Sequence, residues 1–210
     1  MSEFYEIEPS LENYWRAIIL FGRNVASYKF ALAKSLYELK AQGNTIVTLD
    51  QLADPFSRHI CEHLKLVDKQ TTSSSSKYLD FCRAFNSGEI DYQTLINKTV
   101  QFGFVNVIDA FHNVHQQELP KRFFMDARKS HKGIILTDEV FQLFEAQNSV
   151  DLIDETEARW RLVETAWDMN LPKYLVQIQH DDQGILVADN KIRRVNERWS
   201  HLFEQLKAYL

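Results

Sequence analysis

The feature that most constrains the fold of this chain is a long run of apolar residues near its N-terminus, spaced three and four positions apart. The run consists of Tyr14, Ile18, Phe21, Val25, Tyr28, Leu32, Leu36 and Leu39. Such spacing places side chains on one face of an α-helix. Ser10 and Gly43 are typical start and stop residues at its limits. The sequence therefore predicts one helix over about residues 10–42, with another helix approaching closely at Gly22 and Ala26.

The rest of the chain predicts shorter helices and a little β structure. Asp54 and Pro55 indicate the cap and first residue of a helix, and the polar residues 70–76 indicate a mobile surface loop. Gly103, inside an apolar periodicity, indicates a kink or a close contact. Further helices are expected at about 77–86, 91–119, 137–147, 154–169 and 195–209, extended or loop-like structure at 121–124 and 133–136, and a β-hairpin at 174–188.

These elements predict a mainly α-helical fold with a small β-hairpin. The chain has 210 residues, of which 45% are hydrophobic and 25% charged, as in an ordinary globular domain. We expect a multi-helix bundle built around the long N-terminal helix, followed by a helix-helix-hairpin-helix unit. Residues 1–120 would form the helical body and residues 121–210 the second unit, packed together as one compact domain.

Charge and cysteine content limit the classes of function. The net charge is −5, and the acidic excess lies in residues 141–210, which carry eight basic and twelve acidic side chains. Nucleic-acid-coating domains are usually basic, so any such binding requires a local patch. Two cysteines form no disulfide framework, and the acidic start, Met1 to Glu6, is unlike a signal peptide. With no apolar run of 18 residues, we expect a cytoplasmic protein without a membrane partner.

A basic segment with aromatic residues is the best candidate for binding nucleic acid. Lysine and arginine bind phosphates, and aromatic rings stack on exposed bases. The candidate contacts are Lys121, Arg122, Phe123, Arg128, Lys129 and Lys132, with Arg193 and Arg194 further along the chain. The alternative is that Phe123 and Phe124 belong to the core and the charges to a solvated loop. The partner would be DNA or RNA.

Four histidines are the candidates for a metal site, with Cys82 as a further possible ligand. His59 and His63 lie one helical turn apart, and His112 and His115 have a similar spacing on another predicted helix. The spacing matches neither a zinc finger nor a metalloprotease. The alternative, which we favour, is that these histidines are structural residues of the core and its margins. We therefore expect no bound metal and no cofactor.

Helices at 137–147 and 154–169 followed by a hairpin have the order of the second half of a winged-helix module. In a DNA-binding version the second helix enters the major groove. Acidic side chains on this helix and at the hairpin tip would repel phosphate, which favours structural or protein-binding use. The acids are Glu155, Glu157, Glu164, Asp168, Asp181 and Asp182.

Four segments together resemble the N-terminal region of a group of bacterial HNH endonucleases. They are YWRAIILFGRNVASYKFALA at 14–33, FSRHICEH at 56–63, LPKRFF at 119–124 and ARWRLVETAW at 158–167. In that family this region precedes a nuclease domain, and its catalytic histidines and metal ligands have no counterpart in this chain. The resemblance implies a recognition or scaffolding region and carries over no catalytic residue.

Three functions remain open from the sequence. The first is a non-catalytic module that binds nucleic acid or a nuclease partner, in bacterial defence against phage as the resemblance implies. The second is a protein-interaction or inhibitor module with an acidic surface. The third is a metal-dependent nuclease fragment using the histidines. The sequence contains no nucleophile elbow, Walker loop or dinucleotide fingerprint, which favours a non-enzymatic role.

Overall fold

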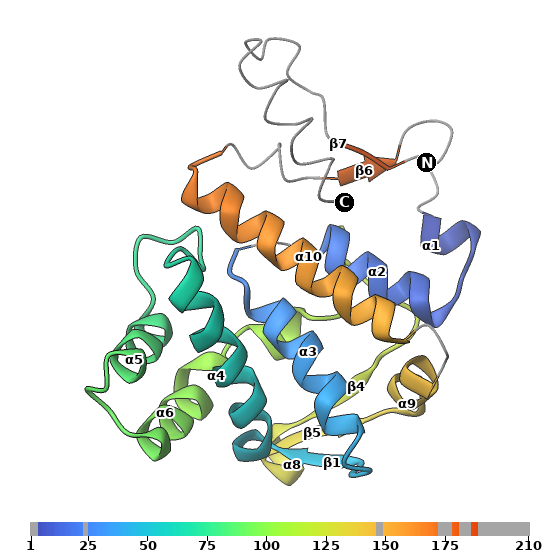
Figure 1. Cartoon of the computed structure of the whole chain (residues 1–210). Coiled ribbons are helices and arrows are strands. Elements are labelled where there is room, and N and C mark those ends of the chain that lie inside the picture. Colours follow the sequence, from blue (N-terminus) through green and yellow to red (C-terminus); the bar gives the residue numbers. More distant parts are fainter. Residues whose placement is uncertain (1–3, 23–24, 146–148, 172–177, 181–185, 189–210) are drawn as a thin grey trace, which may run out of the picture.

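Helices dominate the fold, which a computed structural model describes over residues 4–22, 25–145, 149–171, 178–180 and 186–188 (Figure 1). The predicted class, mainly α with a small amount of β structure, is confirmed. The α-helices are α1 (Phe4–Ile7), α2 (Leu11–Phe21), α3 (Tyr28–Lys40), α4 (Leu49–Leu66), α5 (Lys77–Asn86), α6 (Tyr92–Lys98), α7 (Val107–Ala110), α8 (Arg128–His131), α9 (Asp138–Glu145) and α10 (Ser149–Asp168). The strands are β1 (Ile46–Thr48), β2 (Asn113–Val114), β3 (Gln117–Glu118), β4 (Phe124–Ala127), β5 (Gly133–Leu136), β6 (Ile178–His180) and β7 (Leu186–Ala188).

The predicted helix over residues 10–42 is wrong in its continuity, because it is two helices, α2 and α3. Ser10 caps α2 as expected. The buried Lys29 ammonium ends α2 by donating to the carbonyls of Ile18, Ile19 and Gly22 at 3.0, 3.1 and 2.7 Å. Gly22 and Ala26 do make close contacts, but as single β-bridges to Val114 and Thr71 rather than with a helix. The apolar period continues across the break because both helices pack on one core.

Two predictions about residues 50–76 are also wrong. Helix α4 begins at Leu49, where Thr48 and Gln51 form a reciprocal capping box, so Pro55 lies inside the helix rather than at its first position. The segment 70–76 is not simply a mobile surface loop. Gln70 is fully buried and Thr71 nearly so, and Thr71 forms the bridge to Ala26.

The expected helix over residues 91–119 divides into several elements. Helix α6 runs into a π-helical turn, Thr99–Gly103, and a short α7 follows. A Cβ at Gly103 would lie 3.2 Å from Phe56, which confirms the predicted close contact. The chain then turns back in the β2–β3 hairpin, whose two turn residues, His115 and Gln116, have φ of 50° and 66°. Positive φ at both positions is the geometry of a tight hairpin turn.

A three-stranded antiparallel sheet of order β1-β5-β4 joins residues on both sides of position 120. Thr48 of β1 pairs with Gly133 of β5, which also pairs with Ala127 of β4. Of the two segments expected to be extended or loop-like, 133–136 is the whole of β5 and 121–124 leads into β4, with the short helix α8 between the two strands. The predicted hairpin near 174–188 is confirmed where described, since Ile178 pairs with Ala188. The expected last helix lies outside the described residues.

One aromatic cluster shows where the core lies. Trp15 of α2 is 1% exposed and meets Phe111, Phe123 and Phe144 edge to face, with ring centroids 6.0, 5.2 and 5.0 Å apart. Helix α10 runs across α2 and α3 (Figure 1), and its Trp160 stacks on Phe30 of α3. Residues on both sides of position 120 therefore share one core. Within the described ranges, no helix has the length and apolarity needed to cross a membrane.

Candidate functional site

The aromatic part of the predicted nucleic-acid surface belongs to the core. Phe123 is fully buried and Phe124 is 1% exposed. Phe123 packs against Trp15, and its backbone N–H donates to His112 at 2.9 Å. A buried ring offers no face to a base, so the prediction that Phe123 contacts nucleic acid is wrong. The alternative that the sequence left open, that both rings are in the core, is correct.

Three of the predicted phosphate-binding cations form ion pairs within the chain. Lys121 lies 3.2 Å from Glu139 of α9, and Arg122 pairs with Glu118 of β3. Arg128 forms ion pairs with Asp126, at 2.9 Å, and with Asp109. The Arg128 side chain lowers the pKa of the Asp126 carboxyl by donating hydrogen bonds to it. These carboxylates compete with phosphate for the same donors.

Lys129 and Lys132 are exposed on the α8 turn and have no carboxylate within ion-pair distance among the described residues. Lys132 ends α8 in the left-handed conformation, with φ of 51°, which turns the chain into β5. His131 is exposed beside them. We call residues 128–132, between β4 and β5, the basic turn. Arg193 and Arg194 lie outside the described residues.

The four histidines lie in four separate environments rather than around one metal. The ring of His59 contacts Glu38 of α3 at 2.7 Å, and burial lowers its pKa. His112 accepts the Phe123 N–H, and burial lowers its pKa to about 3. His115 is a turn residue with its ring near Phe21. No group of three or more His, Cys, Asp or Glu side chains suited to a metal occurs among the described residues.

His63 lies at the centre of a buried polar cluster that joins α4 to α10. Its Nδ1 lies 2.8 Å from Glu164 and its Nε2 3.3 Å from Glu157. The imidazole stacks on Trp160 with ring centroids 3.5 Å apart. Burial lowers the pKa of His63, but hydrogen bonds to Glu157 and Glu164 outweigh burial, so the net shift is upward. His63 therefore binds its proton more tightly in the folded chain.

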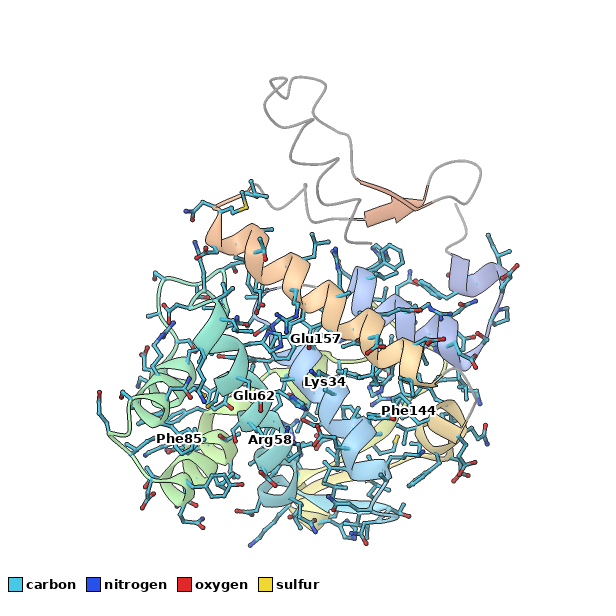
Figure 2. The ribbon with its side chains drawn as sticks, in the orientation of Figure 1. Lys34, Arg58, Glu62, Phe85, Phe144 and Glu157 are labelled. Atoms are coloured by element: carbon cyan, nitrogen blue, oxygen red, sulfur yellow. The ribbon has the colours of Figure 1, made fainter. Side chains whose placement is uncertain are left out.

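Other residues complete this His63 cluster. Lys34 of α3 lies 2.7 Å from Glu157, and Figure 2 shows both side chains between α3 and α10. The fully buried Gln70 donates to Glu164 at 2.6 Å and accepts from the Trp160 indole N–H at 2.9 Å. The sequence places Glu164 among the acidic side chains that would repel phosphate, yet it is 1% exposed. No local pattern could identify this cluster, because the partners of His63 follow it by 94 and 101 residues.

The His63 cluster has acid–base groups but offers no place for a substrate. Hydrogen bonds occupy both imidazole nitrogens, one face of the ring is stacked on Trp160, and the side chain is 4% exposed. A general base needs access to the proton that it abstracts. We therefore interpret the cluster as a connection between helices rather than as a catalytic centre.

The predicted acidic surface is also largely neutralised where it is described. Glu155 forms a two-point ion pair with Arg16, at 2.8 and 2.9 Å. Glu157 contacts Lys34, His63 and Arg161. These two glutamates bind α10 to the body of the protein, so they are not free for a basic partner. Asp181 and Asp182 lie outside the described residues.

A cavity of about 280 Å³ lies between residues 5–14 and residues 117–120. Two tyrosines, two prolines and two glutamates are among its lining residues. None of the histidines or basic residues predicted as site residues lines it. The cavity therefore does not bring the sequence candidates together.

Comparison of the chain with protein-family models, curated proteins and solved structures gave no match.

Proposed function

We propose that this chain is a non-catalytic recognition module that binds nucleic acid through the basic turn between β4 and β5. The observation that carries the proposal is the exposure of Lys129 and Lys132 on this turn, with no carboxylate within ion-pair distance among the described residues. The charge of Lys129 acts on the Asp126 carboxyl only at longer range. His131 adds a ring nitrogen on the same five residues, whereas the Arg128 side chain is held in ion pairs with Asp126 and Asp109. Lysines free of internal ion pairs can replace counterions on phosphates without first breaking a bond within the protein.

The resemblance of four segments to the N-terminal region of HNH endonucleases favours the same role, since that region accompanies a DNA-cleaving domain. A nuclease partner in bacterial defence would then supply the chemistry. Burial of Phe123 and pairing of Lys121 and Arg122 reduce the expected contact area to the basic turn. Binding should accordingly be weak and strongly dependent on salt.

The first prediction concerns charge on the basic turn. Replacing Lys129→Gln and Lys132→Asn together removes two positive charges, and asparagine suits the left-handed backbone at position 132. The double variant should bind nucleic acid more weakly. The slope of log affinity against log salt should become less steep by about two. Fluorescence anisotropy with labelled oligonucleotides, at salt between about 50 and 200 mM, measures both quantities.

Lys65 and Lys77 provide a matched control. Both are exposed lysines without an ion pair among the described residues, and they lie at the end of α4 and the start of α5. The basic turn lies near the start of α4, because Gly133 pairs with Thr48, the residue that caps this helix. Helix α4 has 18 residues, so its far end, where Lys65 lies, is about 27 Å away. The Lys65→Gln, Lys77→Gln variant should bind as the wild type does. Absence of binding at low salt, or equal losses in both double variants, would contradict the proposal.

A further inference from the structure

The outer face of the three-stranded sheet carries a row of exposed apolar side chains. Ile46 of β1 pairs with Ile135 of β5, which pairs with Met125 of β4. Residues paired in this way lie side by side on one face. Ile46 is 45% exposed and Met125 48%, while Ile135 is half-buried. We call these three residues the outer row.

The opposite face of the same sheet packs on the core. Val47 pairs with Ile134, and these residues are at most 1% exposed. Successive side chains of a strand alternate between the two faces, so burial of this pair directs the outer row away from the core. About half of the surface of Ile46 and of Met125 is therefore left in water, which is costly for isoleucine and methionine.

The outer row lies next to the basic turn. Gly133 directly follows Lys132, and it pairs with Thr48 and Ala127. Each of these residues is two positions along its strand from the outer row, a separation of about 7 Å. Two exposed lysines of the basic turn, Lys129 and Lys132, therefore lie on the segment that leads directly into the strand at the centre of the outer row.

We propose that the basic turn and the outer row together bind single-stranded nucleic acid in preference to duplex; this inference rests on the proposed function. In a single strand the faces of the bases can be exposed, so a base face can bury apolar surface against the outer row while the neighbouring phosphates contact Lys129 and Lys132. In a duplex the bases are stacked inside and show only their edges in the grooves. The apolar side chains of the outer row would then face charged phosphates and would have no base face to pack against.

The test compares a labelled mixed-sequence single strand with the duplex made from it. Fluorescence anisotropy at about 50 mM salt should show wild-type protein binding the single strand about tenfold more tightly. The variant Ile46→Thr, Met125→Thr keeps residues suited to strands but removes apolar surface. It should bind single strand and duplex about equally, with duplex affinity unchanged. Circular dichroism and the thermal midpoint establish that this variant folds.

A Leu66→Ala variant is the matched control, because Leu66 is 64% exposed at the far end of α4 and should leave the preference unchanged. Duplex binding as tight as single-strand binding overturns this inference and leaves the proposed function intact. A preference that persists in the folded double threonine variant also overturns it. Binding of neither form overturns the proposed function itself, and this inference with it.

Discussion

At the scale of the residue, His63 shows how burial and charge oppose each other. Removing an imidazole from water favours its neutral form, whereas two nearby carboxylates favour its protonated form. Hydrogen bonds to Glu157 and Glu164 decide the net direction, which is a raised pKa for His63 and a lowered pKa for Glu157. Each charge in this pair thus stabilises the other.

The stability of the protein should therefore depend on the protonation of His63. Because folding raises the pKa of His63, the stability that protonated His63 contributes is fully present below its unfolded-state pKa of about 6.5. This stability is lost as pH rises through its folded-state pKa. For Glu157, with its lowered pKa, the contribution is present above the unfolded value and is lost as pH falls through the folded value. The His63–Glu157 interaction should contribute most between about pH 5 and 6.5.

The corresponding prediction is tested with His63→Gln. We expect urea midpoints of the wild-type protein to fall as pH rises from about 6 to 9, and the variant to lose this dependence. The variant should also be less stable by about 3 kcal/mol near pH 6, because the buried Glu164 would lack a cation. His59→Gln is the control: burial lowers the pKa of His59, so its contribution is lost toward low pH. A fall above pH 6.5 that persists in His63→Gln would contradict the prediction.

At the scale of the element, a single glycine permits β1 and β5 to pair. A Cβ at Gly133 would lie 1.9 Å from the Val47 carbonyl oxygen and 2.7 Å from the Thr48 Cα. Both are backbone atoms that cannot move aside as a flexible side chain can. The sheet joins residues before and after position 120, so this close approach holds two parts of the chain together.

We expect Gly133→Ala to separate β1 from β5 and to destabilise the protein by more than about 3 kcal/mol. Gly43→Ala is the matched control, since no atom lies within 4 Å of its added Cβ. The control loses only about 1 kcal/mol, for a left-handed residue with φ of 75°. Denaturant unfolding at constant pH measures both values. Equal losses in the two variants would show that the contact at Gly133 does not govern pairing.

At the scale of the whole molecule, residues before and after position 120 depend on each other. Trp15 of α2 packs on Phe123 and Phe144, and β1 pairs with β5. Glu157 and Glu164 of α10 form hydrogen bonds with His63. A chain that ends at residue 120 would expose all of these surfaces at once, and exposed apolar surface is the largest cost in unfolding.

The chain should consequently unfold in one cooperative transition. Helix content from circular dichroism and tryptophan fluorescence should give the same midpoint in urea. A fragment of residues 1–120 should lack a cooperative transition. Two separate transitions in the intact chain, or a fragment that unfolds cooperatively, would show that the two parts fold independently.

Much of the secondary structure could be predicted from the sequence because its signals are local. The sequence predicted helices near 77–86 and 137–147, which are α5 and α9, and one near 154–169, which is α10 but begins earlier, at Ser149. The break between α2 and α3 escaped prediction for a physical reason. The buried Lys29 ends α2 by donating hydrogen bonds to its backbone carbonyls. The spacing of apolar residues does not reveal such hydrogen bonds.

The sequence by itself determined the helical class of this protein, the extended region around β4 and β5, and the place of the basic residues along the chain. Only the tertiary structure decided which of those residues are exposed and have no carboxylate within ion-pair distance. Lys121 and Arg128 meet carboxylates 18 and 19 residues away, Phe123 enters the core, and Lys129 and Lys132 remain exposed beside the outer row. Charge pairing and burial depend on which segments lie close together in space. This proximity is a property of the folded chain rather than of any local stretch of sequence.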